Sequence, residues 1–176
     1  PTRFYVQEGA YDKFVARFLA KVEKVKVGDG LASDTKMGPL AQRRRVAAVA
    51  GFIDDAHQRG ATILTGGKAL PGEGNFFAPT VIADLPEDSR LMTEEPFGPV
   101  AGMVRFKTID EVLKRANSLP FGLASYVFTT STRALTLREP ADLADRIVDA
   151  VRAMYRERID LHGKGVRLLG VGVSGL

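Results

Sequence analysis

Apolar residues recur at helical spacing in the first third of the chain. After a short extended stretch at residues 3–7 (RFYVQ), an amphipathic helix is predicted from about Tyr11, with its apolar face formed by Phe14, Val15, Phe18, Leu19 and Val22. A polar loop with several glycines follows over residues 27–40. A second helix is predicted next, because Val46, Val49, Ile53 and Ala56 share one face and Gly60 supplies a stop signal.

Short apolar runs elsewhere predict β-strands at residues 61–64 (ATIL), 79–85 (PTVIADL), 100–106 (VAGMVRF) and 123–129 (LASYVFT). Thr108 and Glu111 have the spacing of a capping box and predict the start of a third helix. A long fourth helix is predicted over residues 139–159, and a final strand over 166–176. Because strands alternate with helices, we expect an α/β fold with a largely parallel sheet flanked by helices.

The composition is that of a chain with one packed core. Of its 176 residues, 45% are hydrophobic and 26% are charged, as in ordinary globular proteins. The chain has no cysteine, which excludes disulfides, zinc–thiolate sites and a thiol nucleophile within these residues. The two histidines, His57 and His162, are isolated, so we expect them at the surface and expect no metal site.

Charge and hydropathy indicate no membrane association. The net charge of +4 is spread along the chain rather than gathered in a polybasic tract. No apolar run approaches the roughly 18 residues that span a bilayer, and the first ten residues lack the apolar segment of a signal peptide. We therefore expect a cytoplasmic protein. The missing initiating methionine is compatible with a fragment or a processed product.

Three glycines near the end, Gly170, Gly172 and Gly175, spell the G-x-G-x-x-G pattern of a dinucleotide-binding loop. Such a loop requires a following helix, because the pyrophosphate binds the amides of the first helical turn. No residue follows Leu176 in the sequence. We therefore favour a glycine-containing strand here over a phosphate-binding loop.

The run TEEPFGPV, residues 93–100, is the strongest candidate for chemistry. Its prolines and glycine predict a rigid turn that projects Glu94, Glu95 and Phe97. A carboxylate there could accept hydrogen bonds from a diol, and the ring could lie against a flat heterocycle. The alternative is an exposed acidic turn with Phe97 as a core anchor. The residue types by themselves favour this second interpretation.

The motif EEPFGPV occurs in order with PTRFYVQEGAYDKFV, KVGDGLASDTKMGPL, GNFFAPTVIADL and RANSLPFGLASYVFT. Residues 1–130 thereby resemble an incomplete catalytic domain of the NAD(P)-dependent aldehyde dehydrogenases, nearest to the succinate-semialdehyde type. The resemblance implies oxidation of a small aldehyde to a carboxylic acid, with NAD or NADP as cofactor. It implies that Glu95 binds the nicotinamide ribose hydroxyls and that Phe97 packs near the nicotinamide. Residues 38–40 and 75–80 match motifs that we expect to be architectural.

The same resemblance implies that other parts of the reaction machinery precede Pro1. In that family the nucleophilic cysteine lies a few residues before the position matching PTRFYV, and the general-base glutamate and the dinucleotide-binding domain lie farther upstream. No catalytic residue is therefore assigned in this chain. We expect the isolated chain to be inactive and, as a partial domain with exposed apolar surface, to self-associate.

Residues 131–176 resemble part of the little-finger domain of Y-family (DinB-type) DNA polymerases, through a TL strand, an EPAD helix and the RLLGVGVSGL strand. This resemblance implies weak, nonspecific contacts with DNA phosphates through Arg167, with Lys164 and Arg133 as further candidates. Two alternatives remain open: the tail completes the α/β core, or the chain is a fusion product without activity.

Overall fold

The computed structural model describes residues 2–120, 124–128 and 168–172. The chain divides into two compact units, one made of residues 13–104 and the other of residues 1–12 with 105–176. Their boundaries fall inside α1 (Glu8–Val22) and inside β4 (Val100–Phe106). The predicted helix over residues 139–159 lies outside the described residues, as do Arg133, Lys164 and Arg167.

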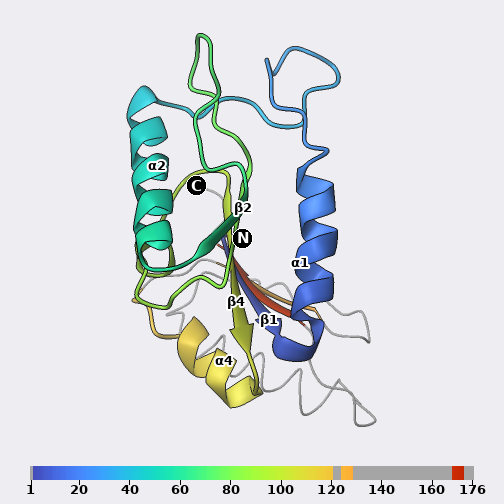
Figure 1. Cartoon of the computed structure of the whole chain (residues 1–176), viewed down its shortest axis with the longest axis vertical. Helices are drawn as coiled ribbons and strands as arrows, with labels where there is room; N and C mark the ends of the chain where they lie inside the picture. The colour runs from blue at the N-terminus through green and yellow to red at the C-terminus, as the bar shows by residue number, and fades with distance from the viewer. Residues whose placement is uncertain (1, 121–123, 129–167, 173–176) are drawn as a thin grey trace. The chain divides into compact units, whose positions relative to one another are not determined.

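The unit of residues 13–104 contains α2 (Arg43–Gln58), β2 (Thr62–Thr65), β3 (Thr80–Ala83) and α3 (Arg90–Thr93), followed by most of β4. Figure 1 shows α2 beside β2, and the two elements are in contact. β2 pairs with β3 in antiparallel orientation, whereas β3 pairs with β4 in parallel, with Thr80 opposite Val100. A parallel pair needs a long crossover connection, and residues 84–99 provide it.

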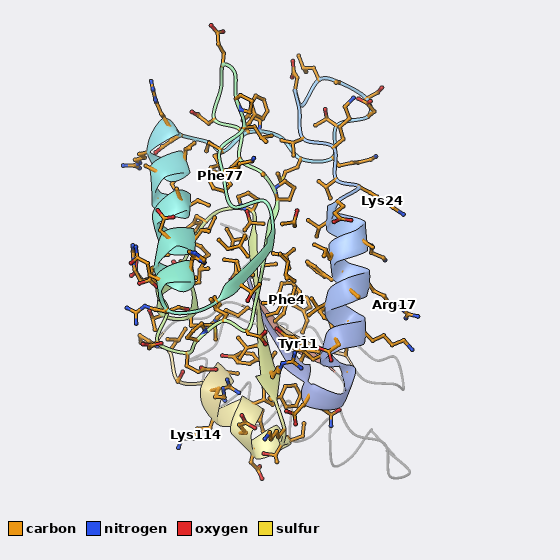
Figure 2. The ribbon with its side chains drawn as sticks, in the orientation of Figure 1. Phe4, Tyr11, Arg17, Lys24, Phe77 and Lys114 are labelled. Atoms are coloured by element: carbon orange, nitrogen blue, oxygen red, sulfur yellow. The ribbon has the colours of Figure 1, made fainter. Side chains whose placement is uncertain are left out.

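The core of this unit follows the predicted apolar faces. The buried side chains of α2 are Val49, Phe52, Ile53 and Ala56, and β3 is buried along its whole length. On α1, Val15 is buried, and Phe14 and Phe18 are half-buried with ring centroids 5.7 Å apart. Arg17 and Lys24 are exposed and point outward, as Figure 2 shows. The amphipathic helix predicted from Tyr11 is confirmed, although it begins earlier, at Glu8.

The second unit contains β1 (Arg3–Gln7), α4 (Ile109–Ala116), β5 (Ala124–Phe128) and β6 (Leu168–Gly172). β6 pairs with β1 and with β5, both in antiparallel orientation. The predicted capping box is confirmed: the Thr108 hydroxyl accepts the Glu111 amide at 3.2 Å, and the Glu111 carboxylate accepts the Thr108 amide at 3.4 Å. On α4, Val112 and Leu113 are buried, while Lys114 is exposed on the outer face (Figure 2).

These pairings confirm one expectation and correct another. Gly170 and Gly172 lie within β6, opposite Phe4 and Ala124, so the strand interpretation is confirmed for these two glycines; Gly175 lies outside the described residues. The α/β class is also confirmed. The sheet is mixed rather than largely parallel, because only β3–β4 is parallel among the described pairs within the two units. β2 and β3 are joined by a loop without a helix, which suits an antiparallel pair.

Within the described ranges, no helix combines the length and the apolar character that a membrane crossing requires.

Candidate functional site

The candidate turn, residues 94–99, lies in the crossover between β3 and β4, directly after α3. Backbone hydrogen bonds fix both of its ends. At the start, the Glu94 amide donates to the Arg90 carbonyl at 2.8 Å. At the end, the Thr80 amide donates to the Pro99 carbonyl at 2.8 Å, which ties the turn to the first residue of β3. The side chains between these two anchors therefore project from a constrained backbone.

The two adjacent carboxylates have different surroundings. Glu94 receives two hydrogen bonds from the Arg90 guanidinium, from Nε at 2.8 Å and from Nη2 at 3.1 Å. The hydrogen bonds from Arg90 lower the pKa of Glu94 below its ordinary value. Glu95 is exposed, and no residue in the described part of the chain bonds its carboxylate. Both carboxylates are exposed, but Glu94 is paired with Arg90 of α3, whereas Glu95 is the carboxylate left to bind a ligand.

Phe97 is exposed on the turn and is not a core anchor. Its side chain is 62% accessible to solvent, whereas the preceding Pro96 is buried. The interpretation of Phe97 as a core anchor is therefore wrong. Its backbone has φ of +41°, in the left-handed region, which costs a non-glycine residue about 1–2 kcal/mol. An exposed ring on strained backbone contributes little to stability, and such strain is typical of sites kept for function.

α2 contacts the turn on both sides of Phe97 through two residues one helical turn apart. Arg45 Nη2 donates to the Pro96 carbonyl, and its guanidinium carbon lies 5.7 Å from the centroid of the Phe97 ring. Val49 packs against Gly98 so closely that a Cβ added there would lie 2.4 Å from Val49 Cγ2. Sequence reasoning missed Arg45, because it stands in a run of three arginines. Its position four residues before the core residue Val49 could have indicated that Arg45 lies on the same face of the helix as Val49.

A polar cluster on α2 holds the segment that precedes the turn. Asp55 Oδ2 accepts the Arg90 amide at 2.8 Å, and Asp55 Oδ1 accepts Arg59 Nε at 2.9 Å. The hydrogen bond from the Arg90 amide is the main cause that lowers the pKa of Asp55, and Arg59 lowers it further. Arg59 also bridges to Asp88 at 2.6 Å, and the Arg90 guanidinium lies 4.6 Å from the Phe52 ring centroid. α2 thus fixes α3 as well as the turn.

Two further sequence motifs meet in this unit. The Leu40 amide donates to the Asn75 carbonyl at 2.9 Å, which joins the segments 38–40 and 75–80. Thr80 is buried, and its hydroxyl accepts the Gly67 amide at 2.9 Å and donates to the Ala78 carbonyl at 2.8 Å. These bonds support the architectural role expected for both segments. No group of three or more metal-ligating side chains occurs among the described residues.

Comparison with known proteins identifies the family of this fold and this turn. The model of the aldehyde dehydrogenase family matches residues 1–153, and the chain belongs to that family. The resemblance recognised over residues 1–130 is therefore confirmed, and the match continues past residue 130. The likeness of residues 131–176 to a polymerase domain stays a prediction.

The chain is similar to two bacterial semialdehyde dehydrogenases. It is 46% identical over 126 residues to a glutarate-semialdehyde dehydrogenase of Pseudomonas putida, covering 72% of this chain and 26% of that protein. It is 43% identical over 126 residues to an NADP(+) succinate-semialdehyde dehydrogenase of Escherichia coli, again covering 72% and 26%. The chain thus spans about a quarter of the length of these relatives.

A solved structure shares the fold. The crystal structure of an E. coli NADP-dependent enzyme superimposes with a TM-score of 0.67 at 42% sequence identity, covering 68% of this chain and 25% of that one. This likeness confirms the expected catalytic-domain architecture.

Proposed function

We propose that this chain supplies a cofactor-contacting part of the catalytic domain of an NAD(P)-dependent aldehyde dehydrogenase whose substrate is a small aldehyde of the semialdehyde class. Its membership of the family and its similarity to two semialdehyde dehydrogenases support the proposal. The observation that carries it is the exposed pair Glu95 and Phe97 on a backbone fixed at both ends.

The chemistry of Glu95 suits the ribose of a nicotinamide nucleotide. An ionised carboxylate accepts two charge-assisted hydrogen bonds from neighbouring hydroxyls, and the Glu95 oxygens are exposed to make them. Phe97 presents an exposed ring that can cover one face of a flat heterocycle. Together these side chains would hold the cofactor in a fixed orientation for reaction. When bound, the cofactor supplies a hydride acceptor.

In this proposal Glu95 and Phe97 bind and orient, and they transfer no proton. The 176 residues include no cysteine that could act as a thiol nucleophile. The expectation that the isolated chain does not oxidise aldehydes stays a prediction. In this proposal the chain contributes to catalysis by positioning the cofactor relative to the substrate.

Nicotinamide mononucleotide provides a direct test, because it contains the ribose diol and the nicotinamide without the adenosine half. We expect it to shift the amide NMR signals of Glu95 and Phe97 in the full chain. Glu95→Gln should weaken its binding about tenfold, equivalent to about 1.4 kcal/mol, because a neutral amide loses the charge-assisted bonds. Glu94→Gln is the matched control and should leave the affinity unchanged, since Glu94 already pairs with Arg90.

A second probe makes the test specific for the diol. A mononucleotide lacking both ribose hydroxyls should bind the wild-type chain and the Glu95→Gln variant equally. Equal weakening by Glu94→Gln and Glu95→Gln, or no response at residues 95–97 to any mononucleotide concentration, would refute the proposed function.

A further inference from the structure

The left-handed backbone at Phe97 requires an external cause. L-residues avoid this region because of a clash between Cβ and the backbone, and a bulky aromatic is an unusual occupant. Asp84 is the other non-glycine residue with positive φ in the described part of the chain, at +49°. Aspartate tolerates this conformation far better than phenylalanine does. Contacts from outside the turn must therefore hold Phe97 in place.

Arg45 makes the contacts that can do so. It is half-buried in the first turn of α2, and its guanidinium reaches a partner 51 residues away, the Pro96 carbonyl. That carbonyl belongs to the peptide immediately before Phe97, so the bond constrains the peptide plane that sets φ of Phe97. The same guanidinium lies over the Phe97 ring, at a distance typical of a cation–π contact. One side chain thus constrains both the backbone and the ring.

The contact is not explained by stability. Arg45 Nε is buried and has no hydrogen-bond partner within the described ranges, and an unpaired buried donor is destabilising. The ring that Arg45 contacts is mostly exposed, so it buries little apolar surface. An unpaired donor next to strained backbone indicates an arrangement kept for its geometry.

Val49 completes the restraint from the other side. Arg45 and Val49 are four residues apart on α2 and so share one face, and they contact Pro96 and Gly98, the two neighbours of Phe97. Phe97 is therefore held between two points on one rigid helix. Glu95 precedes the carbonyl that Arg45 binds, so the path of its backbone depends on the same contact.

We propose that Arg45 is a positioning residue that imposes the left-handed conformation of Phe97 and thereby directs Glu95 and Phe97 toward the cofactor. It acts through the turn and needs no contact with the cofactor. Its effect on cofactor affinity rests on the proposed function. Its effect on the backbone does not, and the two can be measured separately.

The backbone effect is measured by NMR in the full chain without any ligand. A residue with positive φ gives a strong nuclear Overhauser effect between its own amide and α protons. We expect this signal at Phe97 in the wild-type chain and expect Arg45→Ala to weaken it. Arg44→Ala is the matched control, because Arg44 is exposed on the same helical turn and the charge change is identical. The control should leave the Phe97 signal intact.

Arg45→Lys separates positioning from general packing. Lysine can still donate to the Pro96 carbonyl but lacks the planar guanidinium, so we expect it to restore part of the Phe97 signal. Mononucleotide binding should weaken roughly fivefold in Arg45→Ala, because binding then selects a minority conformation, and should recover in part in Arg45→Lys.

The Phe97 signal decides the proposal. If Arg45→Ala folds and retains positive φ at Phe97, the proposal is wrong. If Arg45→Ala does not fold, Arg45→Met replaces it, because methionine keeps an unbranched side chain but cannot donate to the Pro96 carbonyl, and an unchanged Phe97 signal in Arg45→Met would overturn the proposal. If no mononucleotide binds the wild-type chain while Arg45→Ala still alters Phe97, the positioning role stands and the proposed function fails.

Discussion

Replacing Gly98 with alanine should destabilise the chain through a contact that only the tertiary structure creates. An ideal Cβ at Gly98 would lie 2.4 Å from Val49 Cγ2 and 3.4 Å from Val49 Cγ1, whereas carbon atoms pack best about 3.5–4.0 Å apart. Val49 is fully buried, so its side chain has little room to move. Overpacking of this kind typically costs about 1–3 kcal/mol, and we expect the free energy of unfolding to fall by that amount.

A second substitution should relieve the clash. Val49→Ala removes two buried methyl groups and should by itself cost about 2 kcal/mol. In the double variant the new methyl group at residue 98 enters the space that Val49 vacates. The combined loss should therefore be smaller than the sum of the two single losses by at least about 1 kcal/mol.

Gly51→Ala is the matched control on α2. A Cβ added at Gly51 would meet Arg90 Nη1 at 3.8 Å, an ordinary contact. Alanine is favoured over glycine inside a helix by about 0.5–1 kcal/mol, so this variant should be more stable than the wild type. The same chemical change is thus expected to have opposite signs at Gly98 and Gly51.

Urea denaturation followed by circular dichroism measures all four variants, and thermal midpoints should agree, since 1 kcal/mol corresponds to about 2–4 °C in a domain of this size. Two outcomes would refute the reasoning. One is that the losses of unfolding free energy in Gly98→Ala and Val49→Ala add up to the loss in the double variant within about 0.5 kcal/mol. The other is a Gly98→Ala variant that is as stable as the wild type.

Two further predictions concern the same unit. Hydrogen bonds hold the folded-state pKa of Asp55 below its ordinary value, so the stabilisation that ionised Asp55 provides is present above roughly pH 4 and is lost as the pH falls through the folded-state pKa. Asp55→Asn should therefore lower the urea midpoint more at pH 7 than at pH 3. Equal losses at the two pH values would contradict this prediction. Phe97→Ala should change the free energy of unfolding by less than about 1 kcal/mol, because the Phe97 ring is exposed. Phe77 is the control: its side chain is only 1% exposed, so Phe77→Ala should cost about 3–5 kcal/mol. Similar losses for the two variants in thermal denaturation would show that Phe97 belongs to the core.

The sequence singled out residues 93–100 as the candidate site but did not separate the members of that site. Glu94 and Glu95 are identical in type and adjacent, so residue chemistry gives no reason to choose between them. The resemblance to the family selected Glu95. The structure supplies a physical distinction: both side chains are exposed, but Arg90 binds the carboxylate of Glu94 and not that of Glu95.

Local interactions account for what the sequence determined. The capping box at Thr108 and Glu111 joins groups within one helical turn, and it forms as predicted. The apolar periodicity of α1 and α2 was also readable, because helical spacing decides which side chains share a face. The ordered motifs identified the aldehyde dehydrogenase family, since each is a short run that can be compared directly.

Tertiary structure decided the orientation of the strands and the support of the turn. Which strands pair, and in which direction, depends on how the chain returns after each loop, and the mixed sheet was not evident from the apolar runs. Arg45 and Pro96 are 51 residues apart, and Gly98 matters because Val49 packs against it. A sequence pattern records which residues are present, but the strain at Phe97 and the contacts that hold it exist only once α2 and the turn are packed together.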